Sequence, residues 1–129
     1  MPDTQAPLKL LMVDDEKEFA LTLAERLRLR GFTLNVVFDG ASALEHVREE
    51  HFDLVLLDVM LPGMSGLTVQ RRIHEMKPGL PVVLLTGNAS SRDGVEGMKQ
   101  GARAYLNKPV DLPDLLSLFA EIAQESRHA

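Results

Sequence analysis

The sequence predicts an α/β fold in which one parallel sheet is covered by helices on both faces. Apolar runs of five to seven residues alternate with stretches of helical periodicity, and this alternation occurs five times. Most of the runs are continuous, as expected of parallel strands that helices cover on both faces. A chain of 129 residues is long enough for one such domain and too short for two.

Composition narrows the range of functions. The chain has no cysteine, so thiolate metal sites and cysteine nucleophiles are excluded. The net charge is −5 with acids and bases mixed, which argues against nucleic-acid binding by this domain. No run is long enough to span a membrane, and residues 1–7 lack the features of a signal peptide. We therefore expect a cytoplasmic single domain over residues 1–129, with an ordered core at about 8–125 and fraying at 126–129.

The apolar runs are the expected strands. The run that ends at Asp58 is the most apolar and should be central, whereas residues 32–38 partly alternate and should be more exposed. In the second helix, Ala41, Leu44 and Val47 should face the sheet. The expected strands cover 8–13, 32–38, 53–58, 80–86 and 102–106; the expected helices run from the acids at 14–16 to Gly31, from 41 to about 50, from Gly66 to Pro78, from 90 to 100, and from about 111 to 125.

The helix expected over 90–100 should be the least stable of the five. Ser90 or Ser91 would be its N-cap. Gly94 and Gly97 lie inside it, and each costs about 1 kcal/mol relative to alanine.

Functional side chains follow four of the five expected strands. Asp14 and Asp15 follow the first, Asp58 ends the third, Thr86 the fourth, and Lys108 follows the fifth. Taken singly, each could be a helix cap, a turn residue or a solvated charge. Parallel strands, however, bring all of them to one edge of the sheet, where open α/β folds bind ligands. Together they therefore indicate a functional site.

The chemistry of this edge favours phosphoryl transfer. Carboxylates about 4 Å apart repel by about 4 kcal/mol at an effective dielectric constant near 20. Lys108 offsets part of this repulsion, and Mg²⁺, which prefers oxygen ligands, would offset more. The metal and the lysine would neutralise the oxygens of a phosphoryl group, and Asp58 could attack as a nucleophile.

In this order and at these spacings, the residues resemble the receiver domain of two-component response regulators of the chemotaxis type. The resemblance spans residues 8 to about 125. It implies a flavodoxin-like, doubly wound (βα)5 sheet with strand order 2-1-3-4-5. The matching stretches are Val13-Asp14-Asp15-Glu16, residues 56–66 (Leu-Leu-Asp-Val-Met-Leu-Pro-Gly-Met-Ser-Gly), Leu84-Leu85-Thr86-Gly87, Gly101-Ala102 and Tyr105-Leu106-Asn107-Lys108-Pro109.

The resemblance implies a phosphoacceptor and a metal site. Asp58 would accept the phosphoryl group. Mg²⁺ would be held directly by Asp15, Asp58 and the backbone carbonyl of Met60, with Asp14 reaching it mostly through water. Intrinsic dephosphorylation would depend partly on Met60 and Asn88.

The resemblance also implies a switch. Thr86 and Lys108 would each bind a phosphoryl oxygen, and the bond before Pro109 would be cis. Tyr105 would be the aromatic residue that turns inward when Thr86 moves, although an ordinary edge-strand tyrosine is the alternative. The helix over 90–100 and the strand of Tyr105 would form the face that changes.

The expected function is therefore a phosphoacceptor in a two-component or phosphorelay system. The donor would be a histidine kinase or a histidine phosphotransfer protein, and a downstream protein or effector domain would read the change. The domain would catalyse only its own phosphorylation and dephosphorylation, and it could form a phosphorylation-dependent homodimer. None of its own histidines looks like a phosphodonor: His46, His51, His74 and His128.

Three alternatives have less support. An unphosphorylated interaction module on the same fold would require a broken acidic set, and this set is complete. An aspartate-nucleophile phosphatase typically has Asp two residues after the nucleophile, where this chain has Met60. A flavin carrier would need phosphate-cradling loops and flanking aromatics, whereas these strand ends are acidic.

Overall fold

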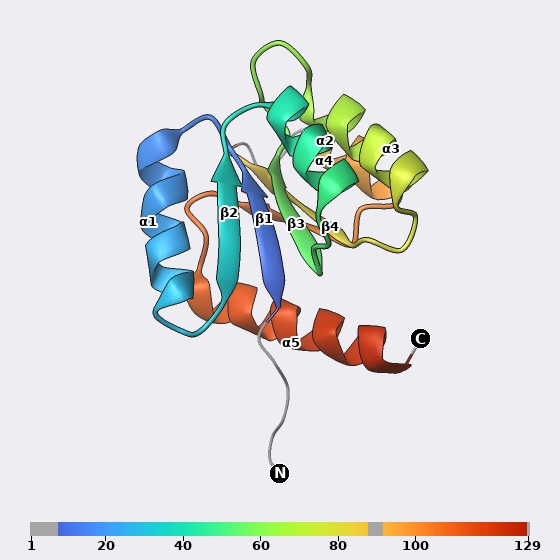
Figure 1. Cartoon of the computed structure of the whole chain (residues 1–129). Helices are drawn as coiled ribbons and strands as arrows, with labels where there is room; N and C mark the ends of the chain where they lie inside the picture. Colours follow the sequence, from blue (N-terminus) through green and yellow to red (C-terminus); the bar gives the residue numbers. More distant parts are fainter. Residues whose placement is uncertain (1–7, 88–91, 129) are drawn as a thin grey trace.

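The computed structural model describes residues 8–87 and 92–128 and, of residues 126–128, the backbone only. These residues form a five-stranded parallel sheet of order β2-β1-β3-β4-β5 with helices on both faces (Figure 1), which confirms the predicted fold class and strand order. The elements are β1 (Lys9–Val13), α1 (Lys17–Arg28), β2 (Thr33–Val37), α2 (Gly40–Glu49), β3 (Leu54–Asp58), α3 (Gly66–Met76), β4 (Val82–Thr86), α4 (Arg92–Lys99), β5 (Ala104–Asn107) and α5 (Leu112–His128).

The central strand is β3, and all five of its residues are buried. The edge strands β2 and β5 are partly exposed, as their weaker apolar pattern predicts. In the register, Val13 pairs with Leu57, Asp58 with Leu85 and Thr86 with Asn107. The carboxyl ends of the strands therefore meet at one edge.

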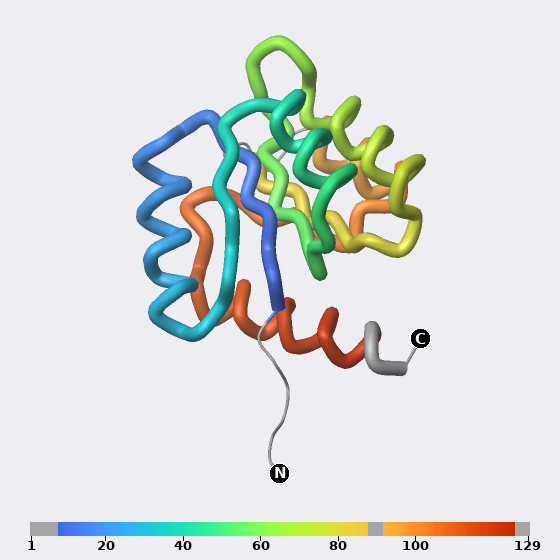
Figure 2. Tube along the Cα trace, viewed as in Figure 1, coloured from blue at the N-terminus to red at the C-terminus, as the bar shows by residue number. Residues whose placement is uncertain are grey.

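Each face of the sheet has its own core, because successive side chains of a strand point to opposite faces. Leu10, Met12, Leu54 and Leu56 pack with α1 and α5 in one core. The other core contains the alternate strand residues, such as Leu57, together with α2 and α3. The chain trace in Figure 2 shows these crossovers, with the green connection from β3 to α3 beyond the carboxyl edge. A residue's position in its strand thus decides which helices it faces.

Two glycines permit close approach of helices to the sheet. A Cβ on Gly66, the first residue of α3, would lie 2.4 Å from the carbonyl oxygen of Asp58, so only glycine fits there. A Cβ on Gly97 of α4 would lie 2.1 Å from Leu84 Cδ1, and the Gly97 carbonyl accepts a hydrogen bond from buried Gln70 Nε2 at 3.0 Å. The Gly66 contact fixes α3 directly against the end of β3.

The structure corrects two expectations. Ala41 is exposed, and α2 buries Gly40, Ala43, Leu44 and Val47 instead, because helical spacing from Val47 returns to residues 43 and 44. The backbone of residues 126–128 is helical, so α5 extends beyond the expected end near 125 to His128, since no glycine or proline interrupts the last turns.

Several expectations about the fourth helix can be compared with the structure only in part. The helix begins at Arg92, and with eight residues α4 is the shortest of the helices described. The proposed caps Ser90 and Ser91, as well as Asn88, lie outside the described residues. None of the described helices combines the length and the apolar composition that a membrane span requires.

Candidate functional site

The site lies at the carboxyl edge, where the strand pattern directs Asp14 and Asp58 to the same face. Asp58 follows Leu54 and Leu56 in the alternation of β3. Asp14 continues the pairing of β1, because its N–H donates to the Val37 carbonyl at 3.1 Å. Both acids therefore fall on the side of the sheet that α1 and α5 cover. They are almost completely buried, with 0% of Asp14 and 3% of Asp58 exposed.

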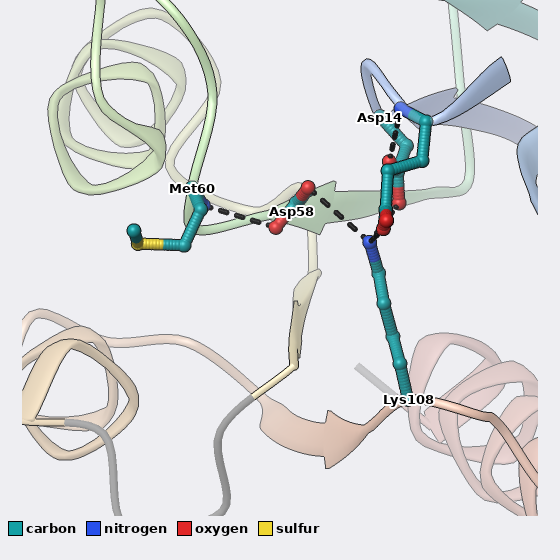
Figure 3. A network of polar contacts seen from close by, with 5 residues as sticks. Asp14, Asp58, Met60 and Lys108 are labelled. Atoms are coloured by element: carbon teal, nitrogen blue, oxygen red, sulfur yellow. Dashed lines mark hydrogen bonds and ion pairs between the residues drawn. The ribbon is translucent and has the colours of Figure 1, made fainter.

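Lys108 brings these acids together. Its Nζ lies 2.8 Å from Asp14 Oδ2 and 3.3 Å from Asp58 Oδ2 (Figure 3), and it also contacts Glu16 Oε1. Lys108 follows β5, and its N–H donates to the Thr86 carbonyl at 2.8 Å. The peptide bond between Lys108 and Pro109 is cis, as the family resemblance implied. The ammonium of Lys108 thus contacts three carboxylates.

Asp58 is held between two donors but is still poorly stabilised as an anion. Its Oδ1 accepts a hydrogen bond from the Met60 N–H at 2.9 Å. Burial raises the pKa of Asp58 from 3.8 to about 6; the Met60 hydrogen bond opposes this rise, the charge of Asp14 adds to it, and Lys108 opposes it. The carboxylate is therefore ionised at neutral pH, but at a cost in folding free energy.

Lys108 provides the positive charge beside the buried Asp58 carboxylate. Burial lowers its pKa, but the close contacts with Asp14 and Glu16 and the charge of Asp58 outweigh burial, so the pKa of Lys108 is raised above its usual value. The ammonium also lies 4.7 Å from the centre of the Phe19 ring, a cation–π contact from α1. Lys108 is thus a permanent cation of the site.

A bend at Asp15 separates the consecutive acids of the turn after β1. The Glu16 N–H donates to Asp14 Oδ1 at 2.9 Å, so this turn holds Glu16 next to Asp14. Asp15 is exposed, and it is Glu16 whose carboxylate oxygen lies within 4.8 Å of those of Asp14 and Asp58. Glu16 was not among the predicted site residues, because its place depends on the turn at Asp14 and Asp15 and not on the strand pattern.

The two residues expected to form the switch lie on the opposite face of the sheet from Asp14 and Asp58. Thr86 is 1% exposed and follows Val82 and Leu84, which belong to the core under α2 and α3. Tyr105 pairs with Leu84 and packs against that same core. Its ring lies against α4, since a Cβ on Gly94 would be 2.8 Å from Tyr105 Cε2. Thr86 and Tyr105 are therefore oriented toward the α4 side of the sheet.

The donor set fits a hard divalent cation. The carboxylate oxygens of Asp14, Glu16 and Asp58 lie within 4.8 Å of one another, and the Lys108 ammonium contacts all three residues. Asp14 Oδ2 is buried and accepts no hydrogen bond of good geometry, so its contact with Lys108 is ionic and leaves acceptor capacity unused. Oxygen ligands of this kind suit Mg²⁺ or Ca²⁺. A cavity of about 580 Å³ lies elsewhere, lined by Phe52, Leu80 and other residues near the amino ends of the strands.

A doubly wound sheet with buried carboxylates and a lysine at its carboxyl edge defines a narrow class of α/β protein. The chain belongs to the response regulator receiver domain family, whose model matches residues 10–120. This result confirms the resemblance recognised in the sequence.

Individual relatives agree with the family. Transcriptional regulatory protein DltR of Streptococcus agalactiae is 38% identical over 110 residues, which are 85% of this chain and 49% of that protein. The chain thus spans about half the length of the curated relatives it matches. A CheY-like receiver domain protein from Methanospirillum hungatei has a TM-score of 0.89 at 30% identity, covering 95% of this chain and 98% of that one.

A further structure carries chemical information about a relative. It is a response regulator protein from Burkholderia pseudomallei described with a phosphorylated aspartic acid, a calcium ion and citrate. It matches with a TM-score of 0.81 at 31% identity, over 93% of this chain and 71% of that one.

Proposed function

We propose that this receiver domain accepts a phosphoryl group on Asp58 from a phosphohistidine of a histidine kinase or a histidine phosphotransfer protein. The observation that carries the proposal is the buried Asp58 carboxylate, which is held by the Met60 N–H and lies beside a permanently charged lysine. The phosphorylated aspartic acid of the Burkholderia relative supports it.

In the proposed reaction, an oxygen of Asp58 attacks the phosphorus, the bond from phosphorus to the histidine nitrogen breaks, and the imidazole leaves. Burial makes Asp58 a poorly solvated and therefore more reactive nucleophile. Lys108 neutralises charge on the phosphoryl oxygens, and the Met60 N–H keeps the carboxylate oriented. Met60 itself has an exposed side chain at the mouth of the site.

Mg²⁺ is the proposed cofactor, and its charge would neutralise the phosphoryl oxygens when it is bound. Asp58, Asp15 and the Met60 carbonyl are the proposed direct ligands, with Asp14 acting through water. The exposed Asp15 side chain would have to turn toward the site, and the acidic set of Asp14, Glu16 and Asp58 supports a cation there.

We propose that phosphorylation alters the face formed by α4 and β5. A phosphoryl group adds a charge of about −1.5 to −2 and three acceptor oxygens, which Thr86 and Lys108 would bind. The contact of Gly94 with Tyr105 would carry the change to α4 and to a downstream protein or output domain. Amide exchange over residues 92–106 should differ with and without a phosphoryl mimic; identical exchange would contradict the switch.

The test is intact mass after incubation with acetyl phosphate and Mg²⁺. The wild type should gain one labile phosphoryl group, and Asp58→Asn, or the wild type in EDTA, should gain none. Asp53→Asn is the matched control, because Asp53 precedes the other end of β3 and binds the Lys9 N–H. Failure of the wild type both here and with a phosphohistidine donor would overturn the proposal.

A further inference from the structure

Glu16 differs from the other two carboxylates that contact Lys108. Asp14 and Asp58 are buried at strand ends, whereas the side chain of Glu16 is 63% exposed. Glu16 occupies the N-cap position of α1 but makes no side-chain capping hydrogen bond there. Its carboxylate instead extends to the ammonium of Lys108. The contact is therefore not required to begin the helix.

Lys108 cannot keep all of these partners once a phosphoryl group is present. A phosphoryl group on Asp58 adds negative charge and three acceptor oxygens at the position that Lys108 must approach. Asp14 is completely buried, so losing its contact with Lys108 would leave a buried charge unpaired. Glu16 can turn into solvent at small cost, because exposed ion pairs contribute little free energy. Glu16 is thus the partner that can be displaced.

We propose that Glu16 is a positioning residue for Lys108, which holds the ammonium in the resting domain and must release it before Lys108 can bind a phosphoryl group on Asp58. This inference rests on the proposed function. It implies that Glu16 opposes the phosphorylated state, although its charge alone would be expected to attract the metal.

The experiment measures binding of beryllofluoride, a phosphoryl mimic, at saturating Mg²⁺ by fluorine NMR. Glu18→Gln is the matched control, because Glu18 is an exposed acid in the first turn of the same helix with no ion pair among the described residues. Glu16→Gln should bind beryllofluoride about two- to fivefold more tightly than Glu18→Gln, which is the factor an exposed ion pair commonly carries.

The variant Glu16→Asp tests whether the length of the side chain matters in addition to its charge. Aspartate keeps the charge but is one methylene shorter, so it should lose the contact and bind beryllofluoride as tightly as Glu16→Gln does. In metal-free protein, the ¹⁵Nζ resonance of Lys108 should shift in both Glu16 variants and stay unchanged in Glu18→Gln. Neither a general effect of removing charge nor unfolding of the variants would produce this pattern.

Three outcomes would overturn the inference. Equal beryllofluoride affinity of Glu16→Gln and Glu18→Gln would mean that Glu16 does not compete for Lys108. A Mg²⁺ affinity at least about tenfold lower in Glu16→Gln than in Glu18→Gln would make Glu16 a metal ligand instead. If the wild type binds no beryllofluoride and gains no phosphoryl group, the proposed function itself fails and the inference falls with it.

Discussion

The two ends of β5 carry two basic residues that each bind several carboxylates, but in opposite surroundings. Arg103 precedes the strand, and its guanidinium contacts Glu121 at 3.1 Å and Glu125 at 3.0 Å. Lys108 follows the strand and contacts Asp14, Glu16 and Asp58. The side chain of Arg103 is 30% exposed and its partners are more than half exposed, whereas that of Lys108 is 11% exposed.

The comparison shows that burial, rather than the number of ion pairs, decides what a cluster does. Around Arg103, water solvates every charge, so the pairs chiefly join α5 to the sheet. Around Lys108, desolvation makes excess negative charge costly and keeps acceptor capacity available for a ligand. Clusters of one basic residue with several carboxylates therefore join helix to sheet at one end of β5 and form the buried acidic site at the other.

The largest effect should come from removing the buried cation. Lys108→Met leaves Asp14 and Asp58 without a counter-charge, so we expect the free energy of unfolding in EDTA to fall by about 3 kcal/mol. Urea unfolding measures this change. The double variant Lys108→Met, Asp58→Asn should recover part of the loss, and a stable single variant would contradict the importance of the pairing.

Removing a carboxylate should raise the free energy of unfolding, whereas removing the lysine lowers it. Asp58→Asn deletes an anion whose pKa is raised to about 6, so in EDTA at neutral pH the free energy of unfolding should rise by about 2 kcal/mol. Asp14→Asn should also stabilise the metal-free protein. Mg²⁺ should stabilise the wild type more than either variant. Equal unfolding midpoints in EDTA would mean that the acids do not crowd one another.

The increase in the free energy of unfolding caused by Asp58→Asn should depend on pH. Because the folded-state pKa of Asp58 lies above 3.8, the folded protein binds more protons between that value and about pH 6. The contribution of Asp58 to stability is thus present at low pH and is lost as pH rises through about 6. The difference between Asp58→Asn and wild type in EDTA should be near zero at about pH 4 and complete above about pH 7. A constant difference would contradict the raised pKa.

The smallest effect should be at the other end of the strand. Arg103→Gln removes exposed ion pairs, so the thermal midpoint should stay within about 2 °C of the wild type. High salt should abolish even that difference, because it screens exposed charges. A loss as large as that of Lys108→Met would show that burial does not distinguish the two clusters.

The order and the approximate positions of the elements could be predicted because the signals are local. The apolar runs of β3 and β4 mark central strands, and the glycine and proline residues after them mark the turns. Asp14, Asp58 and Lys108 could be placed together for the same reason, since parallel strands share an edge. Thr86 could be assigned to the end of its strand and Tyr105 to the interior of the next. Their position on the α4 side becomes clear only when the alternation of side chains along each strand is followed.

What the sequence reasoning missed depends on the geometry of single residues. Glu16 enters the site in place of Asp15 because the chain bends at Asp15 and the Glu16 N–H binds the Asp14 side chain, which holds Glu16 next to Asp14. Ala41 is exposed because helical spacing back from Val47 places residues 43, 44 and 40, and not 41, against the sheet. Such features follow from backbone angles and helix phase, which a pattern of apolar residues fixes only to within a residue or so.

Gly66 has a consequence for how substitutions in this chain would be interpreted. It has no side chain to offer the site, but a Cβ at this position would collide with the backbone of Asp58 and Val59. Any replacement must move α3 away from the end of β3, and with it the carboxylate on which the site depends. A survey of mutational tolerance would therefore rank Gly66 among the functional residues, although its contribution is the space that it leaves empty.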